Sequence, residues 1–186
     1  MPALESRVAW TYKPHQRAYT IGLSGHYGRG KNFGIVNGVP AFPPVDSWGV
    51  NLDYSLPFSR RFNLTGEAFV GRALGMFSVT GGETIGAVRG PGEHGVESRG
   101  GWIQAQFDLS RRWQLNLAYG LEVPNASQLV VGSRWRNQTY MGNLIFKLTP
   151  NVIFAGEYRR LLTDYRNQPF GNERGDHVNL AVGYIF

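Results

Sequence analysis

The sequence predicts an all-β protein, an antiparallel up-and-down transmembrane β-barrel with about nine strands. Three observations predict this class. Apolar and polar residues alternate through about nine segments of roughly nine to twelve residues, the length that a tilted strand needs to cross a bilayer. The connections between these segments are short and long in turn. No apolar run approaches the roughly 20 residues of a spanning helix, so a helical membrane protein is excluded.

The first three expected strands cover residues 4–12, 19–27 and 47–56. Successive side chains of a strand point to opposite faces, so alternation gives each strand one apolar and one polar face. The pattern is cleanest in the third strand. The apolar positions of the three strands are Leu4, Val8, Trp10 and Tyr12, then Tyr19, Ile21, Leu23 and Tyr27, then Trp48, Val50, Leu52, Tyr54 and Leu56.

The next three expected strands cover residues 62–70, 103–109 and 113–122. Asn, Gln, Thr, Asp and Glu occupy the positions between their apolar residues, which predicts a wet face opposite a lipid-facing one. The apolar positions are Phe62, Leu64, Ala68 and Val70, then Ile103, Ala105, Phe107 and Leu109, then Trp113, Leu115, Leu117, Tyr119 and Leu121.

The last three expected strands cover residues 140–148, 152–159 and 177–186, of which the eighth is the shortest. The ninth alternates over ten residues up to the end of the sequence. The apolar positions are Tyr140, Leu144, Phe146 and Leu148, then Val152, Phe154 and Tyr158, then Val178, Leu180, Val182, Tyr184 and Phe186.

The connections give the strands a direction. Membrane barrels of bacteria have short periplasmic turns and long external loops, and an even number of strands. With a periplasmic carboxy end, the first of nine strands would begin outside the cell, so at least one further strand is expected before it. Residues 1–186 are therefore expected to form a single transmembrane segment, the carboxy-terminal portion of a larger barrel. The short connections are 13–17, 57–61, 110–112 and 149–151, and the long ones are 28–46, 73–97, 124–136 and 162–175.

Two other barrels fit the same alternation. If residues 1–17 are not a wall strand, residues 19–186 make a narrow eight-stranded barrel filled by side chains. Such a barrel would act as an adhesin or a structural protein through its external loops, where the adhesion-like tripeptide 174–176 is expected. A soluble lipocalin-like barrel would place the apolar face inside. Aromatic residues at both ends of the apolar face favour a lipid-facing surface.

The last ten residues, HVNLAVGYIF, resemble the closing strand of Gram-negative outer-membrane porins and related barrels, which commonly ends in Phe with another aromatic residue two positions earlier. Phe186 and Tyr184 match that pattern. The resemblance implies a bacterial outer-membrane location and an insertion signal, Tyr184 and Phe186, that the barrel-assembly machinery reads. It also implies a passive channel for small hydrophilic solutes and a homotrimer. A DcaP-like porin is one candidate subfamily, and no residue fixes the subfamily.

The location of the charges matters more than the formal net charge of +6. Much of the basic excess falls in turns and loops, where positive side chains lie beside lipid headgroups. The polar faces of the strands lean acidic. Two interpretations of these charges stay open. They create a transverse electric field across a pore, or they form structural ion pairs within its wall. The candidate pore-lining residues are Arg7, Asp53, Glu67, Glu157 and Arg159.

The sequence gives no sign of chemistry or of a resident cofactor. His26 and His177 fall on the polar faces of strands without the partner spacing of a catalytic site. Neither the histidines nor the carboxylates form a ligand cluster. We therefore expect no enzyme activity, no cofactor, no metal and no nucleic-acid partner. The expected partners are outer-membrane lipid, lipopolysaccharide and small hydrophilic solutes.

Overall fold

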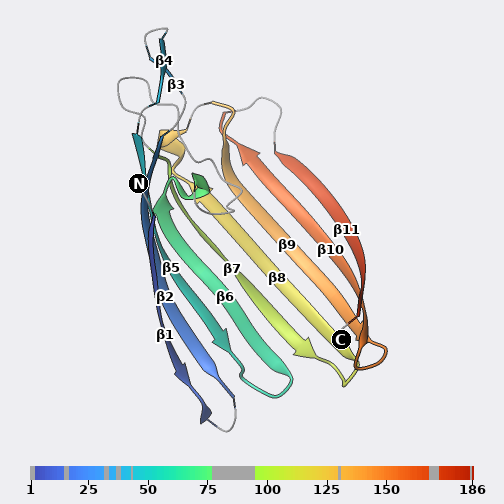
Figure 1. Ribbon diagram of the computed structural model, residues 1–186. Coiled ribbons are helices and arrows are strands. Elements are labelled where there is room, and N and C mark those ends of the chain that lie inside the picture. Colours follow the sequence, from blue (N-terminus) through green and yellow to red (C-terminus); the bar gives the residue numbers. More distant parts are fainter. Residues whose placement is uncertain are drawn as a thin grey trace.

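The computed structural model describes residues 3–14, 17–31, 34–36, 39–42, 44–76, 95–129, 131–167, 172–184 and 186. Its main element is a nine-stranded sheet in which every strand pairs antiparallel with its neighbours in chain order (Figure 1). A separate hairpin joins two short strands at the loop end. The strands of the main sheet are β1 (Leu4–Tyr12), β2 (Tyr19–Lys31), β5 (Pro44–Leu56), β6 (Phe62–Arg72), β7 (Glu97–Asp108), β8 (Trp113–Pro124), β9 (Arg134–Lys147), β10 (Val152–Tyr165) and β11 (Glu173–Tyr184), and the hairpin is β3 (Gly34–Val36) with β4 (Val39–Ala41).

The predicted all-β class and the nine up-and-down wall strands are confirmed. Several strands extend further toward the long loops than the alternation predicts. β7 begins at Glu97 rather than near residue 103, and β9 begins at Arg134 rather than near residue 140. Alternation reports contact with lipid, whereas backbone pairing continues beyond the membrane surface, so these ends carry no apolar signal.

The first strand belongs to the wall. β1 pairs with β2 over its whole length, from Leu4 opposite Tyr27 to Tyr12 opposite Tyr19. The eight-stranded alternative required residues 1–17 to lie outside the wall, and it is wrong. The tripeptide at residues 174–176 lies within β11, with Asp176 opposite Arg160, and not in an external loop. A strand position paired to its neighbour lacks the free presentation that an adhesion loop offers.

The short connections lie together at one end of the sheet and the long ones at the other, as the sequence predicts (Figure 1). Three of the short turns use a hydroxyl oxygen to accept backbone N–H groups. Ser110 Oγ accepts from the amides of Arg112 and Trp113 at 3.2 and 3.1 Å. Ser59 and Thr149 act in the same way in two other turns. Each hydroxyl replaces hydrogen bonds that the tight turn removes from the strand pairing.

The apolar face of the sheet is exposed, even in the middle of the strands. Leu23, Leu52 and Leu117 are 55%, 44% and 48% exposed. A closed soluble barrel would enclose these side chains, so their exposure favours a lipid-facing surface over the lipocalin-like alternative. Aromatic side chains stack across neighbouring strands near the short turns, with ring centroids 5.0 Å apart for Phe62 and Phe107 and 4.5 Å apart for Trp113 and Phe146. These pairs belong to the predicted aromatic belt near the short turns.

Most of the buried apolar side chains of the described residues gather at the loop end, on the polar face, in a group that we call the loop-end cluster. Its members come from β5 and from chain that flanks the long connections. The cluster consists of Val45, Ala73, Leu74 and Val96, and Leu129 is a further buried side chain, which follows β8. Leu74 belongs to the short 3-10 helix η2 (Leu74–Met76), which follows β6, and a second such helix, η3 (Ala126–Gln128), follows β8.

Within the described residues the sheet is open, because β1 and β11 each pair on one side only. In that part of the chain, no helix is long and apolar enough to span a membrane. Closure into a larger barrel stays a prediction.

Candidate functional site

The polar face of the sheet holds all five residues proposed from the sequence, in two separate groups. Arg7, Asp53 and Glu67 lie on β1, β5 and β6 at one side of the sheet. Glu157 and Arg159 lie on β10, with β7, β8 and β9 between the two groups in the strand order. The structure thus brings three of the candidates together and places the other two elsewhere on the same face.

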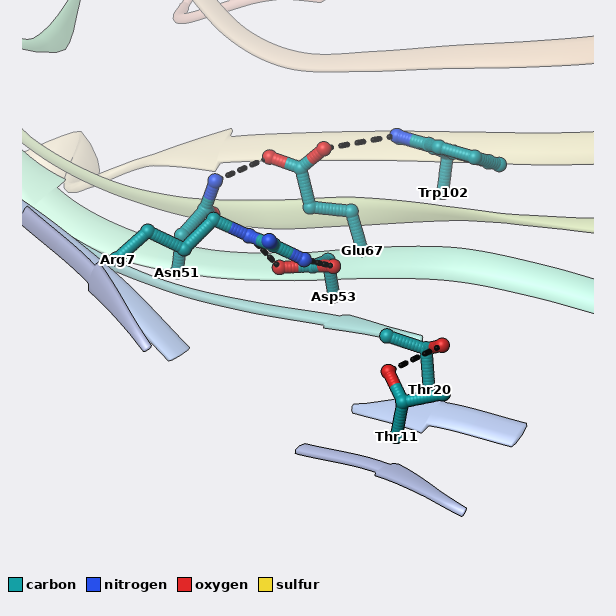
Figure 2. A network of polar contacts seen from close by, with 7 residues as sticks. All are labelled: Arg7, Thr11, Thr20, Asn51, Asp53, Glu67 and Trp102. Carbon is teal, nitrogen blue, oxygen red and sulfur yellow. Dashed lines mark hydrogen bonds and ion pairs between the residues drawn. The ribbon is translucent and has the colours of Figure 1, made fainter. Parts of the chain in front are cut away.

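Arg7 and Asp53 form an ion pair that crosses an intervening strand (Figure 2). Arg7 Nη2 lies 2.6 Å from Asp53 Oδ1, and Arg7 Nε donates to Oδ2 at 3.1 Å. β2 runs between the two residues, and the guanidinium passes over Gly22. A Cβ atom at Gly22 would overlap both Asp53 Oδ2 and Arg7 Nη2, so only glycine leaves room for this bidentate pair.

Glu67 has a different environment, because its two carboxylate oxygens accept from neutral donors (Figure 2). Asn51 Nδ2 donates to Oε1, and Trp102 Nε1 donates to Oε2 at 3.3 Å. Asn51 lies two residues before Asp53 on β5, and Trp102 lies directly opposite Glu67 on β7. The two donors fix the position of the carboxylate without cancelling its charge.

The second group is a compact ion pair within one strand. Arg159 Nη2 lies 2.7 Å from Glu157 Oε1, and Asn179 Nδ2 on β11 donates to the same oxygen at 3.2 Å. Residues two apart in a strand share a face, which is why this spacing brings the two side chains together. Both Arg7 and Arg159 are therefore paired with carboxylates of their own wall. Structural ion pairs of this kind were one of the two interpretations that the sequence left open.

Neutral polar side chains cover much of the remaining face. Asn116 on β8 donates from Nδ2 to Asn143 Oδ1 on β9 at 2.7 Å. At the other side of the sheet, the hydroxyl groups of Thr11 and Thr20 lie 3.2 Å apart. Amides and hydroxyls of this kind suit a surface in contact with water.

The loop-end cluster anchors the chain that leaves β6 against the polar face. Ser47 Oγ, fully buried, donates to the carbonyl of Ala73 at 3.1 Å, and His26 Nε2 lies 3.1 Å from the same hydroxyl. The amide of Ala73 donates to the carbonyl of Val96 at 2.9 Å, which joins the two ends of the long connection. The described ends of this connection therefore lie over the face rather than away from it.

A cavity of about 250 Å³ opens on the polar face between the loop-end cluster and the Glu67 carboxylate. Its wall comes from β1, β2, β5, β6 and η2. The residues that matter for its chemistry are Glu5, His26, Asn51, Glu67, Phe69 and Leu74.

Sequence reasoning missed the two donors that hold Glu67. The strand containing Trp102 was predicted to begin at residue 103, so this indole was not assigned to a face. The sequence places Asn51 on the polar face of the third expected strand. Its contact with Glu67 depends on the register of β5 and β6, which sets residue 53 opposite residue 67, and alternation does not report register. Trp102 follows a glycine pair at residues 100 and 101 that conceals the alternation.

Tyr184 and Phe186, the predicted insertion signal, follow the apolar parity of β11. Tyr184 lies opposite Val152 and is 67% exposed. Phe186 is fully exposed. Their recognition by the assembly machinery stays a prediction.

No family model matches this sequence, and no curated protein is significantly similar to it. A solved structure similar in fold is that of the outer membrane channel DcaP of Acinetobacter baumannii, with 15% sequence identity and a TM-score of 0.84. The match covers 100% of this chain and 52% of the DcaP chain, so this chain spans about half the length of that channel. The likeness confirms that this chain has the predicted fold, that of part of an outer-membrane β-barrel.

Proposed function

We propose that this chain, an outer-membrane β-barrel of the porin type, forms the wall of a water-filled channel through which small hydrophilic solutes diffuse passively. The observation that carries the proposal is the division of all nine strands into an exposed apolar face and a polar face. The apolar face suits lipid and the polar face suits water, which is the arrangement of a porin wall. DcaP, which shares this fold, is described as an outer membrane channel.

Selection in such a channel would rest on size and on the charges of its wall. We expect Arg7, Asp53, Glu67, Glu157 and Arg159 to line the water-filled side, because all five lie on the polar face. The loop-end cluster would narrow the passage at its outer mouth, since it packs on that same face. No reaction is assigned.

The proposed partners follow from the two faces. Outer-membrane lipid would cover the apolar face, with lipopolysaccharide at the loop end. The assembly machinery would read Tyr184 and Phe186 during insertion, and a homotrimer is the proposed assembly. Crosslinking of the protein in intact outer membranes tests the proposed trimer. On complete reaction, a trimer should give a band at three times the monomer mass and no band at twice the monomer mass.

Single-channel conductance tests the proposed function. The protein would be purified from outer membranes and reconstituted in a planar bilayer at two salt concentrations. We expect large, stable current steps that grow with salt concentration, because a water-filled passage conducts in proportion to its ions. Silence from a protein that is folded, as judged by heat-modifiable mobility on a gel, would contradict a channel.

The loop-end cluster favours a second candidate function, a plugged barrel that works through its external surface. Ser47, Ala73 and Val96 are essentially inaccessible to solvent, so the described ends of the long connection are fixed on the polar face. A silent but folded barrel in the conductance experiment would support this alternative.

A further inference from the structure

We propose that Glu67 makes the channel prefer small cations over anions, an inference that rests on the proposed passive channel. The inference depends on which charged side chains of the polar face lack an oppositely charged partner. Arg7 neutralises Asp53, and Arg159 neutralises Glu157, through contacts of 2.6 and 2.7 Å. Within the described residues, Glu67 has no cationic partner, because its donors are an amide and an indole.

The two neutral donors hold the Glu67 carboxylate in one place. One oxygen accepts from Asn51 on the neighbouring β5, and the other accepts from Trp102 on β7. In Figure 2 the carboxylate group lies between these two donors, which reach it from opposite sides. A carboxylate held by neutral groups keeps its full negative charge at a fixed position, whereas a carboxylate in an ion pair presents little net charge to a passing ion.

The surroundings of Glu67 reinforce its sign. Glu67 lines the cavity on the polar face together with Glu5 and His26. Glu5 lies opposite His26 and has no arginine or lysine partner among the described residues, and His26 Nε2 lies 3.1 Å from the Ser47 hydroxyl. The ion pair of Arg7 and Asp53 beside the cavity adds no net charge. The cavity therefore presents two carboxylates and no unpaired arginine or lysine.

The net positive charge of the sequence does not oppose this preference. Arginines at the short turns lie where the lipid headgroups would be. Those on the apolar face at the loop end, such as Arg29 and Arg72, pair with Asp46 and Glu97. Charges outside a water-filled passage are separated from the permeating ions by protein and lipid. A carboxylate within the passage acts at a few ångströms, inside the screening length of about 10 Å at 0.1 M salt.

The reversal potential in a KCl gradient tests the inference. We expect the unaltered protein to favour K⁺ over Cl⁻. We expect Glu67→Gln to lower that permeability ratio by about threefold, since one charge at about 4 Å in water changes a local ion concentration by about fivefold at most. Asp176→Asn is the matched control, because it removes a carboxylate from the apolar face, where Asp176 accepts from the Tyr158 hydroxyl at 2.6 Å. It should leave the ratio unchanged.

A second variant separates charge from structure. The sequence contains no cysteine, so Glu67→Cys offers a single thiol for labelling. A sulfonate-bearing thiol reagent should restore the preference for K⁺, and a trimethylammonium-bearing reagent should invert it. Glu67→Asp, which keeps the charge, should retain the preference.

Three results would overturn the proposal, each in channels that conduct normally. They are a preference for Cl⁻ in the unaltered protein, an unchanged ratio in Glu67→Gln, and an equal ratio after labelling with either reagent. A folded protein that gives no current at all would instead contradict the proposed channel. The failure of the selectivity inference is thus distinguishable from the failure of the proposed function.

Discussion

Gly22 is the residue on which the contact between β1 and β5 depends. Its position on β2 lies directly beneath the ion pair of Arg7 and Asp53, where any side chain would occupy the space of both partners. Sequence reasoning identified both charged residues and the face they share. It could not predict their contact, because that contact skips a strand and depends on the absent side chain of a third residue.

We expect Gly22→Ala to separate Arg7 from Asp53 and to lower the denaturant midpoint of the protein in detergent. Gly120→Ala is the matched control, since a Cβ atom there meets its nearest neighbour, Trp102 Cβ, at an ordinary 3.8 Å. The control should not lower the midpoint. If Gly22→Ala has the same effect with and without Arg7→Gln and Asp53→Asn, the clash with the ion pair is not the cause.

The strands and turns were the most predictable elements. Alternation located all nine wall strands, and the short turns were correctly placed between them. The loop ends of β7 and β9 escaped prediction, because residues outside lipid are free of the alternation that lipid imposes. The inward packing of the loop-end cluster also escaped, since Ala73, Leu74 and Val96 belong to no periodic segment.

At the turn between β7 and β8, we expect Ser110→Ala to lower the free energy of unfolding by about 1 kcal/mol, because two backbone amides lose their acceptor. Ser55→Ala is the control, since the Ser55 hydroxyl makes no hydrogen bond to any described residue. Equilibrium unfolding in detergent, followed by tryptophan fluorescence, measures both. Equal stability of the two variants would contradict the role assigned to the turn hydroxyl.

At the scale of the whole molecule, the described residues form one main sheet with an apolar face and a polar face. Many apolar side chains that a water-soluble protein would bury are exposed here, and the buried apolar side chains among the described residues lie toward the loop end. The sequence predicted this inversion through its period of two and its two aromatic belts. The sequence left open which charged side chains form ion pairs with one another. Ion pairing depends on strand register and on the length of each side chain, and the period of the alternation reports neither.

Adjacent substitutions on β8 test the assignment of the faces. We expect Leu117→Arg to destabilise the protein in bilayers by about 2 to 4 kcal/mol, because the side chain would enter hydrocarbon near mid-strand. Ala118→Arg, on the next residue and the opposite face, should be tolerated. Insertion into liposomes, followed by heat-modifiable mobility, checks both. Comparable insertion of the two variants would contradict the orientation.

One glycine of the polar face has a consequence for the width of the proposed channel. His26 and Leu74 lie over Gly49, and each has an atom closer than 3.0 Å to the place where a Cβ atom would stand. An alanine at Gly49 would displace the overlying imidazole ring and leucine side chain while leaving the number of charged side chains unchanged. In a water-filled passage, one added carbon atom at this position would therefore alter the width and leave the ion preference as it is.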